Sequence, residues 1–313
     1  MKTVLFVNHK ELRCGVHEAG IGIYKIISRS TKYKVEYAEI ENESEFRQKF
    51  ESTKPDIIFY NHHHLTIGWI PNSLIEEFNK TSKSIATQHD GFHNPDGKSF
   101  NYYLYADAAL DVPKEWNNVF VIGRPLREYF GEYPVNSLPT IGSFGFGFPR
   151  KRYELIAKTV NDEFDEAIIN FQMPYAKYGD NDGGYSRKYA ELSRRAITKP
   201  GIKLNISHEY ISEDALLKFL AGNDINVFLY EDAPESGSAS TIDWALAVKR
   251  PLAVSKTHMF AHLKTEPSIY LEDSNLRTIM NNGIAPLEKF YKLWSVEGNI
   301  KYYDHIFDVM LNV

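Results

Sequence analysis

The chain has 313 residues, of which 43% are hydrophobic and 25% charged, with a formal net charge of −5 and a single cysteine, Cys14. This length and composition predict a soluble protein with room for two domains. The negative balance excludes a general basic field for nucleic acid or an anionic membrane, and one cysteine excludes an internal disulfide or a multi-cysteine metal site. No stretch is long and apolar enough to span a membrane, and the opening MKTVLFVNHK indicates a strand instead of a signal peptide. We therefore expect a cytoplasmic protein without stable membrane insertion.

The first half of the chain alternates strands and helices. We expect strands at 3–7, 34–40, 56–60, 84–87, 108–112 and 119–122, and helices at 21–28, 43–52 and 73–79. A first strand, a glycine-bearing loop and a helix are typical of a doubly wound α/β domain, but Gly15, Gly20 and Gly22 lack the spacing of the dinucleotide fingerprint. Three histidines at 62–64 follow the third strand. Adjacent residues of an extended chain point to opposite faces, so one metal ion cannot easily bind all three, and we predict no metal site.

A second alternation follows a linker at 131–139, which contains two prolines and a glycine. We expect its strands at 140–144, 167–171, 202–206, 227–230, 252–255 and 268–271. We expect its helices at 153–160, 185–197, 212–220 and 242–248, and a helical tail at 275–313. The chain is therefore predicted to form two doubly wound domains, 1–135 and 136–313.

The most informative stretch is 226–255, which predicts a buried strand, a loop of small residues and a helix. Gly237 lets a ligand approach the loop backbone, and the serines and threonine beside it can cap the helix. Free N–H groups at a helix start attract an anion. Two carboxylates, Glu235 and Asp243, bracket the loop, so the stretch suits the diphosphate and the hydroxyls of a nucleotide sugar. An ordinary strand–loop–helix unit is equally compatible with this stretch alone.

The same stretch resembles the donor-binding segment of GT-B glycosyltransferases, especially the retaining family-4-like group. Glu235 matches the first Glu of that group's Glu-x7-Glu signature, and the Lys-Arg-Pro run at 249–251 matches the turn after the helix. Asp243 stands where the second Glu would be, which is a departure. Gly15, in the run Cys-Gly-Val, resembles the loop that faces the donor, and His89 resembles the His-Asp segment that reaches the donor sugar.

The resemblance also implies which residues hold the donor. Lys151 matches the lysine of a basic pair that clamps the diphosphate, while Ser143 occupies the position of its arginine, so that Arg150 would complete the clamp. Tyr210 lies where the family holds the nucleotide base. The implied catalytic residues are His89, Glu235 and Lys151. The implied donor-binding residues are Gly15, Ser143, Arg150, Lys151, Tyr210, Gly237, Ser238, Ala239, Ser240 and Asp243. A loop histidine bonded to local backbone is the alternative for His89, and a surface lysine at a helix start is the alternative for Lys151.

The resemblance implies the GT-B fold, in which two Rossmann-like doubly wound domains face a cleft. The acceptor side would be 1–135 and the donor side 136–313, and the helix at 300–309 suits the terminal helix that crosses back over the first domain. The implied function is transfer of a sugar from a UDP- or GDP-linked donor to an unidentified acceptor (saccharide, lipid-linked glycan, protein or modified nucleic acid), with retention and without a metal or other cofactor. Asp180 and Asp182 resemble the Asp-x-Asp metal motif of the other glycosyltransferase fold, but they lie in a long loop and we interpret them as turn residues. A non-catalytic GT-B-like sugar- or nucleotide-binding or scaffold protein and a nucleotide-sugar epimerase are the alternatives.

Overall fold

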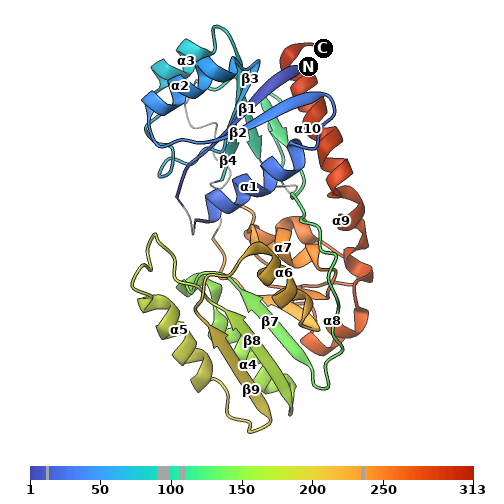
Figure 1. The fold of residues 1–313 in the computed structure, drawn as a ribbon. Coiled ribbons are helices and arrows are strands. Elements are labelled where there is room, and N and C mark those ends of the chain that lie inside the picture. Colours follow the sequence, from blue (N-terminus) through green and yellow to red (C-terminus); the bar gives the residue numbers. More distant parts are fainter. Residues whose placement is uncertain (12–13, 90–98, 106, 108–109, 234–236) are drawn as a thin grey trace. The chain divides into compact units, whose positions relative to one another are not determined.

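The computed structural model describes residues 1–313 except 12–13, 90–98, 106, 108–109 and 234–236 (Figure 1). The chain divides into two compact units. Unit 1 comprises Met1–Pro125, Glu235–Ser238 and Lys292–Val313, and unit 2 comprises Leu126–Pro234 and Ala239–Tyr291. From the sequence we expect the boundary at 135 and a terminal helix that crosses back over the first domain. The contacts group Leu126 onward with unit 2 and Lys292–Val313 with unit 1.

The sheet of unit 1 has six parallel strands in the order β2-β1-β3-β4-β5-β6. They are β1 (Lys2–Asn8), β2 (Tyr33–Glu39), β3 (Ile57–Tyr60), β4 (Lys83–Gln88), β5 (Tyr102–Tyr105) and β6 (Val119–Val121). Of the strand expected at 108–112, residues 108–109 lie outside the described residues and 110–112 are not in a strand; the strand that pairs with β4 is the tyrosine-rich β5. Its last three residues are buried, so the rings supply the apolar surface that a buried strand needs.

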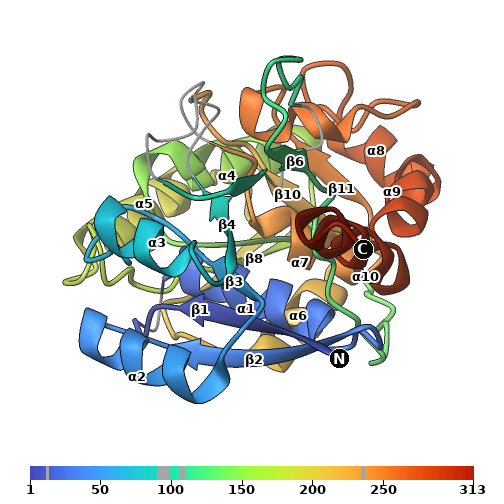
Figure 2. The ribbon, with the colours of Figure 1, turned by 90° about the horizontal axis from the view of Figure 1, so that it is seen from above.

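Both faces of this sheet are covered, because successive residues of β1 enter opposite apolar clusters. Val4 and Phe6 pack in the cluster that includes α1 (Gly15–Ile27) and α10 (Val296–Leu311). Leu5 and Val7 pack in the cluster that includes α2 (Glu43–Thr53) and α3 (Asn72–Phe78). Figures 1 and 2 show α2 and α3 together on one side of the sheet. The helix α10 is thus part of the core of unit 1, although it lies at the far end of the sequence.

The sheet of unit 2 has five parallel strands in the order β11-β10-β7-β8-β9. They are β7 (Thr140–Phe144), β8 (Ala167–Gln172), β9 (Ile202–Ser207), β10 (Ile225–Phe228) and β11 (Leu252–Val254). The helices are α4 (Tyr153–Glu163), α5 (Gly184–Arg195), α6 (Glu213–Ala221), α7 (Thr241–Ala247) and α8 (Leu276–Asn282), while α9 (Glu288–Leu293) spans the division between the units. Residues 268–271, expected to form a strand, contribute a single bridge from Tyr270 to Val254. Among the described residues, no helix has the length and apolarity needed to cross a membrane.

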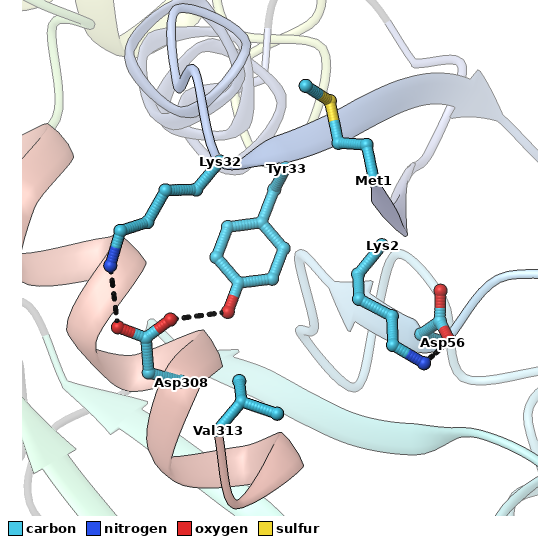
Figure 3. A pocket seen from close by; sticks show the side chains of 7 residues that line it. All are labelled: Met1, Lys2, Lys32, Tyr33, Asp56, Asp308 and Val313. Carbon is cyan, nitrogen blue, oxygen red and sulfur yellow. Dashed lines mark hydrogen bonds and ion pairs between the residues drawn. The ribbon is translucent and has the colours of Figure 1, made fainter.

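A surface pocket of unit 1 lies where β1 and β2 begin (Figure 3). In it, Lys32 Nζ and Tyr33 OH donate to the carboxylate of Asp308 at 2.9 and 2.7 Å. Across the pocket, Lys2 Nζ donates to Asp56 at 2.8 Å. Ligands of doubly wound domains bind beyond the carboxyl ends of the strands, at the opposite edge of the sheet. The bonds of Lys32 and Tyr33 therefore connect the start of β2 to α10. The functional site is expected at the other edge of the sheet.

Candidate functional site

The centre of the sheet of unit 2 is β7, and the chain turns sharply where this strand ends. Gly145 has a φ of +132°, which an L side chain rarely adopts, so the turn requires glycine. Its N–H donates to the carbonyl of Gln172 at 3.0 Å, and its carbonyl accepts from Tyr153 OH at 2.7 Å. The short 3-10 helix η1 (Pro149–Lys151) follows and brings Lys151 back to the end of the strand.

Two further side chains and the backbone of Gly145 lie near Lys151. Its Nζ lies 3.6 Å from the centroid of the Tyr230 ring, just after β10. The Tyr230 hydroxyl donates to Oγ1 of Thr241, the first residue of α7, at 3.1 Å. A Cβ placed on Gly145 would lie 3.8 Å from Thr241 Cγ2 and 3.9 Å from Lys151 Cε. The glycine, the amine, the aromatic face and the hydroxyl therefore lie around one point at the carboxyl end of β7.

Lys151 as a residue is half-buried, whereas its amine is desolvated. Burial lowers its pKa to about 7, and within the described part of the chain no carboxylate forms an ion pair with it. The face of Tyr230 favours the charged form only weakly compared with a full negative charge. Binding an anion would restore the charge of the amine, so this point suits a phosphate or another anionic group.

A second polar and aromatic group lies at the carboxyl ends of β8 and β9. The side-chain amide of Gln172 donates to Ser207 Oγ at 3.2 Å. His208 Nδ1 donates to the carbonyl of Met173 at 2.8 Å, and its ring centroid is 5.2 Å from that of Tyr175. Tyr210, two residues after His208 in the chain, is 40% exposed. Rings with one open face are suitable for stacking a nucleotide base.

The other residues expected to bind a donor have different environments. Ser143 is buried within β7, whereas Arg150 is exposed in η1 and its carbonyl accepts from Glu231 N at 2.8 Å. Asp243 is buried, as is every residue of α7. Glu235 lies outside the described residues, and Gly237 and Ser238 are half-buried beside it.

The start of α7 is less open to an anion than the sequence indicated. The N–H of Ala239 donates to the carbonyl of Met259 at 3.2 Å, and that of Asp243 donates to the carbonyl of Ser240 at 3.1 Å. The half-buried Ser240 makes no side-chain capping bond. The helix has only seven residues. Lys151 is therefore the better anion-binding group of this unit.

In unit 1, His89 lies just after β4 and its Nε2 is 2.6 Å from Oδ1 of Asn61. Asn61 follows β3 and is fully buried. Gly15 begins α1, and a Cβ placed there would meet no atom within 4 Å. His89 is thus held by a side chain from the neighbouring strand.

The acidic loop before α5 has a structural role. The carboxylate of Asp180 accepts from the N–H groups of Tyr185 and Ser186 at 2.7 and 3.0 Å, and Asp182 accepts from Gly184 N at 3.2 Å. These are bonds of a turn and a helix start, as interpreted from the sequence. In the part of the chain that the structure describes, no three His, Cys, Asp or Glu side chains are placed to hold a metal ion.

Sequence reasoning missed Tyr230, Thr241, Gln172 and Asn61 as members of these groups. For Asn61 a signal exists, since it is a polar residue that directly follows an apolar strand. The tyrosine and threonine have no such signal, because their role depends on which strands are neighbours.

Comparison with known proteins yields similarity in structure only. No protein-family model and no curated protein matches the chain. Similar solved structures include Anabaena HepE in complex with UDP and glucose (12% identity, 99% of this chain and 100% of that chain, TM-score 0.63). A trehalose-6-phosphate synthase, OtsA, has 10% identity over 100% of this chain and 99% of its own, with a TM-score of 0.66. A sucrose-phosphate synthase from Thermosynechococcus elongatus has 8% identity over 100% of both chains, with a TM-score of 0.71. With two parallel-sheet α/β domains that match these structures over their whole length, the chain has the GT-B glycosyltransferase fold.

Proposed function

We propose that the chain is a glycosyltransferase whose donor is a nucleotide sugar, and that Lys151 binds the diphosphate of that donor. The observation that carries this proposal is the desolvated Lys151 amine, which lies at the carboxyl end of the central strand with no carboxylate partner among the described residues. The UDP and glucose in the HepE complex, and the sugar phosphate named in the two synthases, support a sugar-transfer function for the same fold.

Departure of a nucleoside diphosphate develops negative charge on the leaving phosphate. A charged Lys151 would stabilise that charge in a site with little water, and Arg150 would add a second positive charge. Gly145 would let a phosphate oxygen come close to the backbone, because glycine carries no side chain of its own.

The remaining roles follow from the resemblance to the retaining family-4-like group. Tyr210, two residues after His208 in the chain and 40% exposed, would contact the base. Asp243 would accept from the ribose hydroxyls, and Glu235 would contact the transferred sugar. We further propose that the reaction proceeds with retention and without a metal, so that activity survives a chelator. Recovery of lost activity by manganese or magnesium would contradict this last point.

The test combines binding with turnover. UDP, GDP and their sugar conjugates are each added to the protein, and the melting temperature and the release of nucleoside diphosphate are measured. A ligand at a hundredfold excess over its dissociation constant should stabilise the fold by about 2.7 kcal/mol. The variant Lys151→Met should lose this stabilisation. If no nucleotide at millimolar concentration changes the melting temperature, the proposed donor site is wrong. Binding without any release of diphosphate from the whole donor panel would instead indicate the non-catalytic alternative.

A further inference from the structure

Polar side chains at the carboxyl ends of adjacent strands in unit 1 are linked by hydrogen bonds. The strands β2, β1, β3 and β4 are neighbours in that order. Tyr37 and Glu39 belong to β2, Asn8 ends β1, Asn61 follows β3, and His89 follows β4. Both asparagines are fully buried. The links therefore span four of the six strands, at the edge of the sheet where doubly wound domains bind ligands.

Backbone groups fix the direction in which each amide points. Asn8 Oδ1 accepts from the N–H of His9 at 3.0 Å, and Asn8 Nδ2 donates to the carbonyl of His17 at 3.2 Å. Asn61 Nδ2 donates to the carbonyl of Val16 at 2.8 Å. A backbone N–H can only donate and a carbonyl can only accept, so the oxygen and nitrogen of neither amide can be exchanged.

The protonation of His89 follows from these orientations. Asn61 Nδ2 also donates to Asn8 Oδ1 at 2.8 Å, which leaves Asn61 Oδ1 facing His89 Nε2 at 2.6 Å. An amide oxygen only accepts, so the Nε2 of His89 must carry the proton. At the other end, Asn8 Nδ2 donates to Tyr37 OH at 3.1 Å and Tyr37 OH donates to Glu39 Oε1 at 2.9 Å. Every bond thus donates in the same direction, from the imidazole toward the carboxylate.

Glu39 and Tyr37, at the far end of the series, have the charge states that this direction of donation requires. Burial raises the pKa of Glu39, but hydrogen bonds from His17 and Tyr37 outweigh it and leave the pKa below its usual value. Burial raises the pKa of Tyr37, so its hydroxyl remains a donor. Hydrogen bonds in series polarise one another, and a series that ends on an anion strengthens the donors before it.

We propose that Asn61 is a positioning residue that holds His89 as the Nε2–H tautomer, through a hydrogen-bonded series anchored on Glu39. In the neutral ring held in this way Nδ1 is an acceptor, and in the charged ring it is a donor; we expect the proposed contact with a sugar to depend on that difference. Only the contact with a sugar rests on the proposed function, and the tautomer itself does not.

Gly20 of α1 offers an independent way to disturb the series. A Cβ at this position would lie 2.4 Å from Asn61 Nδ2 and 2.8 Å from Asn8 Nδ2, so any side chain displaces the two amides. Gly20→Ala therefore acts on the orientation of Asn61 without removing a hydrogen-bonding group. It complements Asn61→Ala, which leaves a small cavity.

The tautomer is read directly by long-range proton–nitrogen NMR of protein labelled with ¹⁵N-histidine, at a pH where the rings are neutral and with His89→Gln to identify the signals. We expect wild-type His89 to be the Nε2–H tautomer, and both Asn61→Ala and Gly20→Ala to give a mixture. A wild-type His89 that is Nδ1–H, or already a mixture, would overturn the proposal whether or not the variants fold.

Turnover of a nucleotide sugar supplies the second readout. Loss of one hydrogen bond corresponds to about a tenfold change in rate, so Asn61→Ala should lower kcat about tenfold and change the KM for the donor by less than about twofold. Tyr37→Phe should lower kcat by less than Asn61→Ala. Tyr24→Phe is the matched control, because the Tyr24 ring lies 4.7 Å from that of Tyr37 but its hydroxyl is not one of the links.

The two readouts separate the two proposals. If His89 is Nε2–H and no donor is turned over, the proposed function fails and the tautomer stands. If a donor is turned over while kcat of Asn61→Ala equals that of wild type, the positioning role is wrong.

Discussion

Binding of a nucleotide sugar should weaken as the pH rises from 6 to 8, because the charge of Lys151 is lost over this range. With a pKa of about 7 in the free protein, the amine is about 90% charged at pH 6 and about 10% charged at pH 8. In the complex the diphosphate holds the amine charged, so binding at pH 8 must include uptake of a proton. By linkage, affinity falls about tenfold between the two pH values and approaches a constant below pH 6.

Calorimetric titration with UDP-glucose measures this dependence, with other UDP- or GDP-sugars as substitutes if it does not bind. The diphosphate of such a ligand is a diester with no proton to exchange in this range, so the dependence belongs to the protein. Titration at pH 8 in buffers of different ionisation enthalpy counts the protons taken up, and we expect close to one. Lys151→Arg is the matched control, since arginine stays charged and its binding should vary little with pH. Equal affinity at pH 6 and pH 8, with no proton uptake by the wild type, would refute the role of Lys151.

Three further predictions concern single side chains. Because the pKa of Lys151 is depressed in the folded state, the unfolded chain binds more protons above pH 7, and the ligand-free protein gains stability as the pH rises toward 10. Lys151→Met should therefore raise the free energy of unfolding at pH 7 by about 1 to 3 kcal/mol in urea titrations, and an unchanged or lower value would contradict the desolvation. Burial and the nearby His17 lower the pKa of His9 to about 4, so His9 costs stability as the pH falls below 6.5. Between pH 8 and pH 5 this loss is about 2 kcal/mol and should disappear in His9→Gln, and an equal loss in both proteins would disprove it. Glu235→Gln should lower turnover about ten- to a hundredfold and leave the affinity for UDP intact, whereas Asp243→Asn should weaken the binding of UDP. Full turnover by Glu235→Gln would show that the Glu235 carboxylate is structural.

The fold was predictable because its strands are continuous apolar runs. The residues of β1 that face the two sides of the sheet are equally apolar, as expected for a parallel sheet with helices on both faces. The run at β5 was misplaced, since Tyr102–Tyr105 combine a polar hydroxyl with a large ring and do not read as a simple apolar strand. Burial of the rings decides the outcome, and burial depends on the neighbouring strand.

The candidate site was predictable only where a local motif exists. Lys151 follows a glycine-rich turn after a strand, and the resemblance predicted it as a donor-binding residue. Its contacts with Tyr230 and Thr241 come from β10 and α7, which are remote in sequence and meet β7 only through the order of the strands. A pattern along the chain does not contain that order.

The link from Asn61 to His89 was out of reach for the same reason. It requires β3 and β4 to be neighbours with their ends at the same level, which the pairing of Tyr60 with Ala86 establishes. Each residue alone reads as an ordinary polar group at a strand end, and the direction of the hydrogen bonds appears only when the backbone partners of both amides are known.

The most direct test of the central claim is a crystal structure of the protein with the nucleotide diphosphate or nucleotide sugar that binds it. We expect the diphosphate beside Gly145 at the carboxyl end of β7, within hydrogen-bond distance of Lys151 Nζ, with the amine drawn from the ring of Tyr230 toward a phosphate oxygen. A nucleotide bound elsewhere, for example in the pocket of Figure 3, with Lys151 still on the tyrosine face, would contradict it.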